Sequence, residues 1–199
     1  MLWLITGGIG CGKSEFAHEL ALTVGREGIR LSCPPFPEGR TRTKHRDVDN
    51  EPHFPWTYTD ADETLANKLN AINMESNIFR ADRRVIVMDS LSGWLRGLYE
   101  QIQEDTPEAD NRIDRAWQEV LAAILSFEGK MIVITEEISA GLSMSLREQG
   151  YAYRLAAANR RLLEASTTLY RMTAGMATEV KGYRLKRGTL VDENIYTDR

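Results

Sequence analysis

The sequence has few cysteines and no long hydrophobic run. Its 199 residues include only Cys11 and Cys33, too few for the disulfide framework of a small secreted protein. No apolar stretch is long enough to cross a bilayer, and the first residues lack the basic region of a signal peptide. We therefore expect a cytoplasmic protein without a membrane span.

An excess of positive charge is also absent. Lysine and arginine total 25 against 29 acidic residues, which gives a net charge of −4. A nucleic-acid-binding domain normally carries a basic surface, so this balance argues against a nucleic-acid partner. Hydrophobic residues make up 42% of the chain, enough for one globular core. We expect one domain over residues 1–185, followed by a polar tail over residues 186–199.

Proline is scarce outside a single segment. Five of the six prolines fall within residues 34–56, a density that excludes a continuous helix or a central strand. Two of the three histidines, His45 and His53, lie in the same segment. So do the basic residues Arg40, Arg42, Lys44 and Arg46. The segment is either a solvated surface loop or an active-site loop that handles anions.

The first fourteen residues carry the clearest motif in the chain. Leu2–Thr6 is a short apolar run typical of a buried parallel strand, and an amphipathic helical pattern follows residue 14. Between them, GGIGCGKS fits the phosphate-loop pattern G-x-x-x-x-G-K-[ST]. Its residues are Gly7, Gly8, Ile9, Gly10, Cys11, Gly12, Lys13 and Ser14. In such a loop the backbone N–H groups bind phosphate, while the lysine reaches the β- and γ-phosphates. The alternative is a glycine-rich turn that binds nothing.

Asp89 completes a second motif. It follows the buried run Val85–Met88, and a carboxylate at this position in P-loop proteins holds Mg²⁺ beside the phosphate loop. We therefore expect Ser14 and Asp89 to be the metal-binding residues. An aspartate after a strand can also be a simple helix cap, so Asp89 gains its significance from the phosphate loop upstream.

The remaining pattern alternates between strands and helices. Strands are expected at 29–33 and 130–135, and helices at 61–81, 91–103, 113–125 and 153–165. Residues 104–110 read as a polar link, residues 168–180 as a hairpin, and His18 as a solvated helix residue. This alternation predicts an α/β fold with a mainly parallel sheet. Glu136 and Glu137 follow the strand at 130–135, where α/β proteins place their sites, although helix-start acidity is an equal explanation.

Four segments in order resemble a known family, the bifunctional adenosylcobinamide kinase / adenosylcobinamide-phosphate guanylyltransferases of cobalamin biosynthesis. ITGGIGCGKSEFAHEL resembles the family's TGG-x-x-SGKS loop, and VIVMDSLSGWLRGL resembles its LVDCLTLWL-x-NL segment. VITEEISAGL is similar to V-x-NEVG-x-G. The stretch from Arg147 to Gly175 is similar to the family's FRD-x-x-G-x-x-NQ-x-x-A region and the hairpin after it.

This resemblance implies a RecA-like P-loop sandwich and two reactions. A nucleoside triphosphate, ATP or GTP, phosphorylates a hydroxyl of the corrinoid adenosylcobinamide, and GMP from GTP is then joined to that phosphate through a guanylyl-histidine. The implied catalytic residues are Lys13, Asp89, Glu137 and His45, whose context Arg42-Thr43-Lys44-His45-Arg46 resembles the family's histidine loop. Mg²⁺ is the implied cofactor, and family members are often homo-oligomers.

Two other functions stay open from the residues themselves. The histidine loop departs from the family pattern, which suits a P-loop kinase of another small hydroxylated substrate. The other open function is a nucleotide-gated binding module without catalysis, because P-loop folds also occur in molecular switches.

Overall fold

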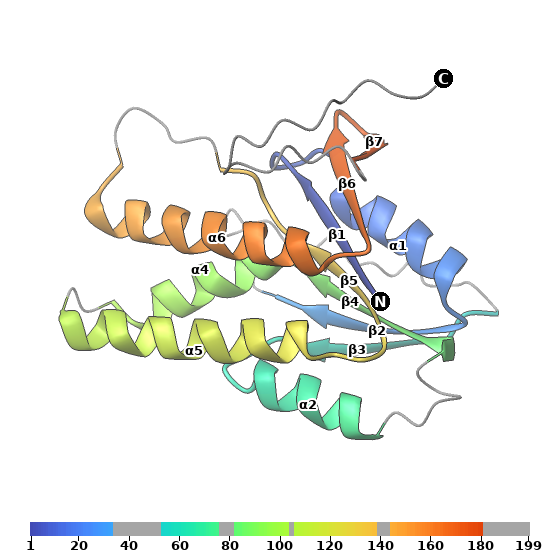
Figure 1. Cartoon of the computed structure of the whole chain (residues 1–199), viewed down its shortest axis with the longest axis horizontal. Helices are drawn as coiled ribbons and strands as arrows, with labels where there is room; N and C mark the ends of the chain where they lie inside the picture. The colour runs from blue at the N-terminus through green and yellow to red at the C-terminus, as the bar shows by residue number, and fades with distance from the viewer. Residues whose placement is uncertain (34–52, 76–81, 104–105, 139–143, 181–199) are drawn as a thin grey trace, which may run out of the picture.

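The computed structural model describes residues 1–33, 53–75, 82–103, 106–138 and 144–180 (Figure 1). The first half of the chain forms β1 (Leu2–Gly7), α1 (Lys13–Val24), β2 (Glu27–Ser32), β3 (Trp56–Asp60), α2 (Leu65–Glu75) and β4 (Arg84–Asp89). The second half forms α4 (Leu91–Gln101), α5 (Pro107–Leu125), β5 (Lys130–Ile134), α6 (Leu146–Ala165), β6 (Thr168–Thr173) and β7 (Met176–Glu179).

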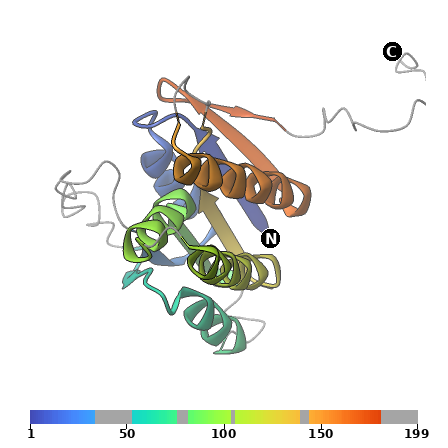
Figure 2. The same cartoon turned by 90° about the vertical axis from the view of Figure 1, so that its left-hand side faces the viewer.

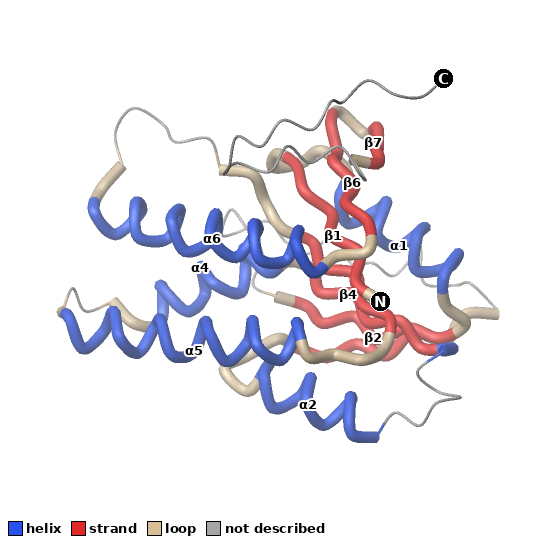
Figure 3. The backbone as a smooth tube through the Cα atoms, viewed as in Figure 1, coloured by secondary structure: helices blue, strands red, loops and turns tan. Residues whose placement is uncertain are grey.

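The strands form one sheet in the order β3-β2-β4-β5-β1-β6-β7, labelled in Figure 1 and drawn in red in Figure 3. Every neighbouring pair is parallel except the terminal hairpin β6–β7. The carboxyl ends of β1, β2, β4 and β5 therefore lie along the same edge of the sheet. This edge carries the phosphate loop and Asp89.

Helices cover both faces of the sheet, so the fold has three layers. One core joins side chains of α2, α4, α5 and α6 to alternate residues of the strands, and it includes Trp94 and Trp117. The other core joins Ala17 and Ala21 of α1 to the opposite face, with Val85 and Val87 beneath them. Figures 1 and 2 show the four helices of the first layer gathered together, apart from α1. The predicted three-layer α/β sandwich with its C-terminal hairpin is confirmed.

A polar network ties α6 to α4 and α5. Arg154 of α6 donates to Asp114 of α5 at 2.7 Å and to the Tyr99 hydroxyl of α4 at 2.5 Å. Beside it, the Tyr151 hydroxyl donates to the carbonyl of Ser92 at 3.0 Å, and burial raises the pKa of Tyr151 to about 12. Tyr151 is therefore a neutral structural donor at physiological pH, not an acid–base group.

The structure contains an edge strand, β3, that the sequence did not predict. The proline-rich segment was expected to be irregular through Trp56, but residues 56–60 form β3, which pairs in parallel with β2 at the edge of the sheet. Threonine and aromatic residues favour an extended strand, and an edge position tolerates the neighbouring Pro55. The strand is short and mostly exposed, so it lacks the buried apolar run that marks the central strands.

The prediction for His18 was wrong for a related reason. Its side chain is buried, and its ring stacks on Trp56 with 5.2 Å between the ring centroids. Trp56 approaches α1 only because β3 joins the sheet, so a residue outside the apolar stripe of α1 becomes covered.

Two helices begin earlier than predicted. α5 starts at Pro107 inside the expected polar link, because the Thr106 hydroxyl accepts the Ala109 N–H and proline suits the first helical turn. α6 starts at Leu146, where Ser145 and Glu148 form a capping box. Both starts are polar, so hydrophobic spacing alone does not mark them.

Gly28 offers a test of the β2–β3 packing. A Cβ at this position would lie 2.4 Å from a ring carbon of Trp56 and 2.9 Å from one of Phe54. We expect Gly28→Ala to lower the free energy of unfolding by about 1–3 kcal/mol through overpacking, as measured by chemical denaturation. Gly8→Ala is the matched stability control, because no heavy atom of the described residues lies within 4 Å of its added Cβ. Equal stability of the two variants would contradict this packing.

Candidate active site

The phosphate loop leaves β1 and enters α1 through three glycines with positive φ. These are Gly7 (148°), Gly10 (74°) and Gly12 (90°), conformations that other residues rarely adopt. A Cβ on Gly7 would also lie 2.6 Å from the Met172 carbonyl oxygen of β6. Gly12 is the N-cap of α1, and no side chain in the described part of the chain caps this helix end. The N-terminus of α1 therefore presents its first amides without a competing cap, as anion binding requires.

Lys13 lies folded into this loop. Its side chain is buried, and its ammonium donates to the carbonyl oxygens of Gly8 at 2.6 Å and Gly7 at 3.2 Å. The Cys11 sulfur lies 3.9 Å from the same nitrogen, and Cys11 is a free thiol. The positive charge is thus held against the loop, where the predicted β- and γ-phosphates would bind.

Asp89 meets Ser14 across the sheet edge. The Ser14 hydroxyl donates to Asp89 Oδ1 at 3.0 Å, so the two predicted metal ligands lie side by side. The strand β5 separates β1 from β4 within the sheet, and α1 places Ser14 over this gap.

Asp89 also has a partner that no sequence motif indicates. Arg30 of β2 is 3% exposed, and its Nη2 lies 2.6 Å from Asp89 Oδ2. The sequence signal for it was an arginine within a short, mainly apolar strand. A pairing between residues that are far apart in the sequence has no local pattern, so no motif marks Arg30 as the partner of Asp89.

Glu137 lies next to the phosphate loop. Its backbone N–H donates to the Gly7 carbonyl at 3.2 Å, and its carboxylate accepts from Thr6 at 2.9 Å and from Arg171 of β6 at 2.7 Å. The Glu137 side chain is 40% exposed, so it is accessible from solvent while these hydrogen bonds hold it in place. Three strand ends, those of β1, β5 and β6, therefore fix this predicted residue.

Asn159 of α6 anchors the chain just before Glu137. Its side-chain oxygen accepts from the Thr135 hydroxyl at 2.8 Å, and its amide nitrogen donates to the Glu136 carbonyl at 3.1 Å. On the other side of the phosphate loop, the hairpin residue Gly175 donates its N–H to the Cys11 carbonyl at 3.2 Å. On one side of the phosphate loop, α6 thus holds the residues that follow β5. On the other side, the β6–β7 hairpin contacts the loop directly.

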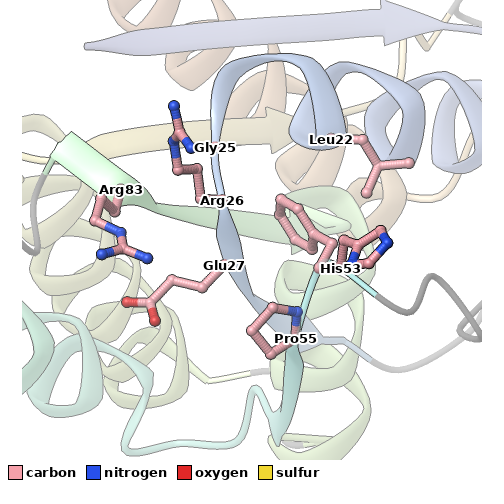
Figure 4. A pocket seen from close by; sticks show the side chains of 8 residues that line it. Leu22, Gly25, Arg26, Glu27, His53, Pro55 and Arg83 are labelled. Atoms are coloured by element: carbon pink, nitrogen blue, oxygen red, sulfur yellow. The ribbon is translucent and has the colours of Figure 1, made fainter.

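Of the two histidines in the proline-rich segment, the structure describes only His53. His45 lies outside the described residues. His53 lines a cavity of about 410 Å³ at the amino ends of β2 and β4, with Leu22 and Arg83 among its other lining residues (Figure 4). The phosphate loop lies at the carboxyl end of β1, and α1 runs from there toward this cavity, rising about 18 Å over its 12 residues. The structure therefore separates His53 from the phosphate loop.

The donor set at Ser14 and Asp89 fits Mg²⁺. Magnesium prefers oxygen ligands, and proteins often supply only one or two of them while water and phosphate provide the rest. Among the residues that the structure describes, no group of three or more His, Cys, Asp or Glu side chains could hold a metal, so a site built wholly from such protein ligands is not found there.

The family comparison decides the assignment. Residues 3–180 match the CobU family, described as cobinamide kinase / cobinamide phosphate guanyltransferase. The chain belongs to this family. The matched range contains the phosphate loop, Asp89, Glu137 and the terminal hairpin. It confirms the resemblance found in the sequence and the P-loop α/β fold, and it assigns adenosylcobinamide kinase and guanylyltransferase activity in cobalamin biosynthesis to this transferase.

Other comparisons add little to the CobU assignment. No curated protein matches the sequence. A search of solved structures finds a KaiC-like protein, PH0186, from Pyrococcus horikoshii OT3, at 18% identity and a TM-score of 0.46, over 85% of this chain and 69% of that one. None of the helices in the described ranges is long and apolar enough to span a membrane.

Proposed function

We propose that the loop at residues 7–14 binds the triphosphate of the kinase reaction, with Lys13 neutralising charge on the transferred phosphoryl group. The contact between Ser14 and Asp89 carries this proposal, because it unites the two predicted metal ligands beside the loop lysine. Mg²⁺ held by this pair would supply positive charge at the phosphate oxygens. The substrate hydroxyl attacks the γ-phosphorus, the bond from the γ-phosphorus to the bridging oxygen breaks, and the nucleoside diphosphate leaves. The hydroxyl proton passes to a nearby carboxylate.

We assign Glu137 to the substrate hydroxyl. Its carboxylate is accessible and fixed beside the phosphate loop, which suits a group that accepts a hydrogen bond from the attacking hydroxyl. We expect Glu137→Gln to lower kcat of the kinase reaction by about 100-fold, the lower end of general-base contributions, with little change in nucleotide affinity.

Initial rates of phosphorylated corrinoid formation, together with calorimetric nucleotide affinity, check this expectation. The neighbouring Glu136→Gln is the matched control, because Glu136 contacts Asn159 through its backbone carbonyl, which the substitution keeps. A kcat for Glu137→Gln within about threefold of the parent would remove Glu137 from the chemistry, since a general base contributes far more.

For the guanylyltransferase reaction we propose His45 as the nucleophile. A neutral imidazole nitrogen attacks the α-phosphorus of GTP and pyrophosphate leaves, which forms a guanylyl-histidine. An oxygen of the corrinoid phosphate then attacks the same phosphorus and the P–N bond breaks, which frees His45. The basic residues Arg42, Lys44 and Arg46 would offset charge on the phosphoryl oxygens. The sequence context of His45 supports this role.

The proposed kinase reaction can be tested with purified full-length protein, Mg²⁺, adenosylcobinamide and either ATP or GTP. We expect a phosphorylated corrinoid with at least one nucleotide, detected by mass spectrometry, and no product when Mg²⁺ is chelated. Turnover of nucleotide without corrinoid binding would favour a kinase of another hydroxylated substrate. Stoichiometric nucleotide binding without turnover would favour a nucleotide-gated module.

Three broader predictions accompany this function. We propose a homo-oligomer, to be measured by light scattering, and a cytoplasmic location. The division into a domain at 1–185 and a tail at 186–199 also stays a prediction, because residues 181–199 lie outside the described part of the chain.

A further inference from the structure

Arg30 is a buried charge inside a parallel sheet. It lies near the middle of β2, is 3% exposed, and pairs in register with Val87 of β4 and Tyr58 of β3. A charged side chain in such a place is costly unless a nearby opposite charge compensates it. The compensating group is Asp89, whose Oδ2 lies 2.6 Å from Arg30 Nη2.

The two oxygens of Asp89 have different partners. Oδ2 accepts from Arg30, and Oδ1 accepts from the Ser14 hydroxyl at 3.0 Å. Strand alternation places both charged residues on the α1 face, because Leu31 packs in the opposite core while Val87 packs under α1. The ion pair therefore lies on the side of the sheet from which Ser14 approaches.

We propose that Arg30 is a positioning residue for the nucleotide-bound metal, acting by fixing Asp89. This inference rests on the proposed function of the loop at 7–14. Because Arg30 holds Oδ2, Oδ1 remains directed at Ser14 and keeps accepting the hydrogen bond from its hydroxyl. A hydroxyl that donates its proton leaves its oxygen lone pairs available to a cation. Arg30 thus orients Ser14 as a ligand through Asp89.

The same pairing restricts how Asp89 meets the metal. Turning the carboxylate onto a cation would take it from a guanidinium with almost no access to water, and a buried charge that loses its partner is strongly unfavourable. Mg²⁺ sheds its water reluctantly. Asp89 would therefore meet a bound Mg²⁺ through water, while Ser14 would supply the direct protein ligand.

The test measures how much Mg²⁺ strengthens nucleotide binding. Calorimetric titrations with ATP, and in parallel with GTP, are run with Mg²⁺ and with EDTA, and the ratio of the two Kd values is the metal-dependent gain. We expect Arg30→Met to reduce this gain by about tenfold or more, a usual cost of losing an outer-shell partner. The metal-free Kd should change little, because Lys13 and the loop amides are untouched.

Arg84→Met is the matched control. It removes another arginine–carboxylate pair between the same two strands, Arg84 with Glu27 at 3.1 Å, at the opposite end of their ladder. Its metal-dependent gain should equal that of the parent. Arg30→Lys keeps a charge but not the planar fork, so we expect a gain between those of Arg30→Met and the parent. Thermal unfolding of each metal-free protein reports folding, and where Arg30→Met does not fold, Arg30→Lys decides the test.

A double-mutant cycle separates positioning from a merely structural role. On an Asp89→Asn background, Arg30→Met should cause no further loss of the gain, because Arg30 acts through that carboxylate. Independent, multiplying losses would overturn the inference. So would a gain within about twofold of the parent in Arg30→Met and Arg30→Lys, far below an outer-shell effect. A parent protein that binds neither nucleotide would instead overturn the proposed function, and the inference with it.

Discussion

Replacing Lys13 with methionine should lower the kinase rate by about 1,000-fold or more, because the variant loses the loop cation that offsets charge on the transferring phosphoryl group. Methionine keeps a similar length without the charge. In the protein without nucleotide, the ammonium contacts the carbonyl oxygens of Gly7 and Gly8. These loop carbonyls cannot replace it at the phosphates, since they are acceptors. Initial rates at saturating ATP and corrinoid, with calorimetric Kd values for ATP, measure the effect.

Lys68→Met provides the matched control for this loss. Lys68 pairs with Asp62 at 2.6 Å near the start of α2, away from the phosphate loop. We expect its kinase rate to equal that of the parent. A Lys13→Met rate within about tenfold of the parent would contradict the role given to Lys13, because one well-placed donor to a developing negative charge already contributes more. Thermal unfolding of both variants separates lost chemistry from lost structure.

The central strands and the phosphate loop were predictable because their signals are local. Residues 85–88 and 131–134 form continuous apolar runs, and both lie in buried strands in the structure. The loop motif fixed the position of Lys13 between β1 and α1. Asp89 was predicted from the carboxylate that follows a buried strand in P-loop proteins, and Glu137 from the family resemblance and its place after a strand, where α/β proteins have their sites; the carboxyl ends of parallel strands share an edge. The structure brings both carboxylates to that edge, beside the loop.

What the sequence did not reveal depends on contacts between distant segments. β3 is a short edge strand whose stability comes from pairing with β2, and the burial of His18 follows from that pairing. The Arg30–Asp89 ion pair joins residues 59 positions apart, so no spacing rule detects it. Thr106 and Ser145 cap the starts of α5 and α6, and hydrophobic periodicity does not reveal such polar helix ends.

A labelling experiment tests which of the two histidines of the proline-rich segment carries the guanylyl group. Incubation of the parent protein with α-labelled GTP and Mg²⁺ should leave acid-labile, alkali-stable label on the chain, as expected for a phosphorus–nitrogen bond. γ-Labelled GTP should leave none through this step, because that phosphate departs in pyrophosphate. We expect His45→Ala to abolish the label completely, since no other group would form the covalent bond.

His53→Ala is the matched control, and the structure argues for its outcome. His53 lines a cavity at the amino ends of the strands, and the length of α1 separates it from the phosphate loop. We therefore expect full labelling of His53→Ala. Label that persists in His45→Ala and disappears in His53→Ala would assign the nucleophile to His53 and require GTP to bind at the cavity instead of the loop. Absence of label in the parent would remove the guanylyl-histidine while leaving the Lys13 and Asp89 chemistry of the kinase unaffected.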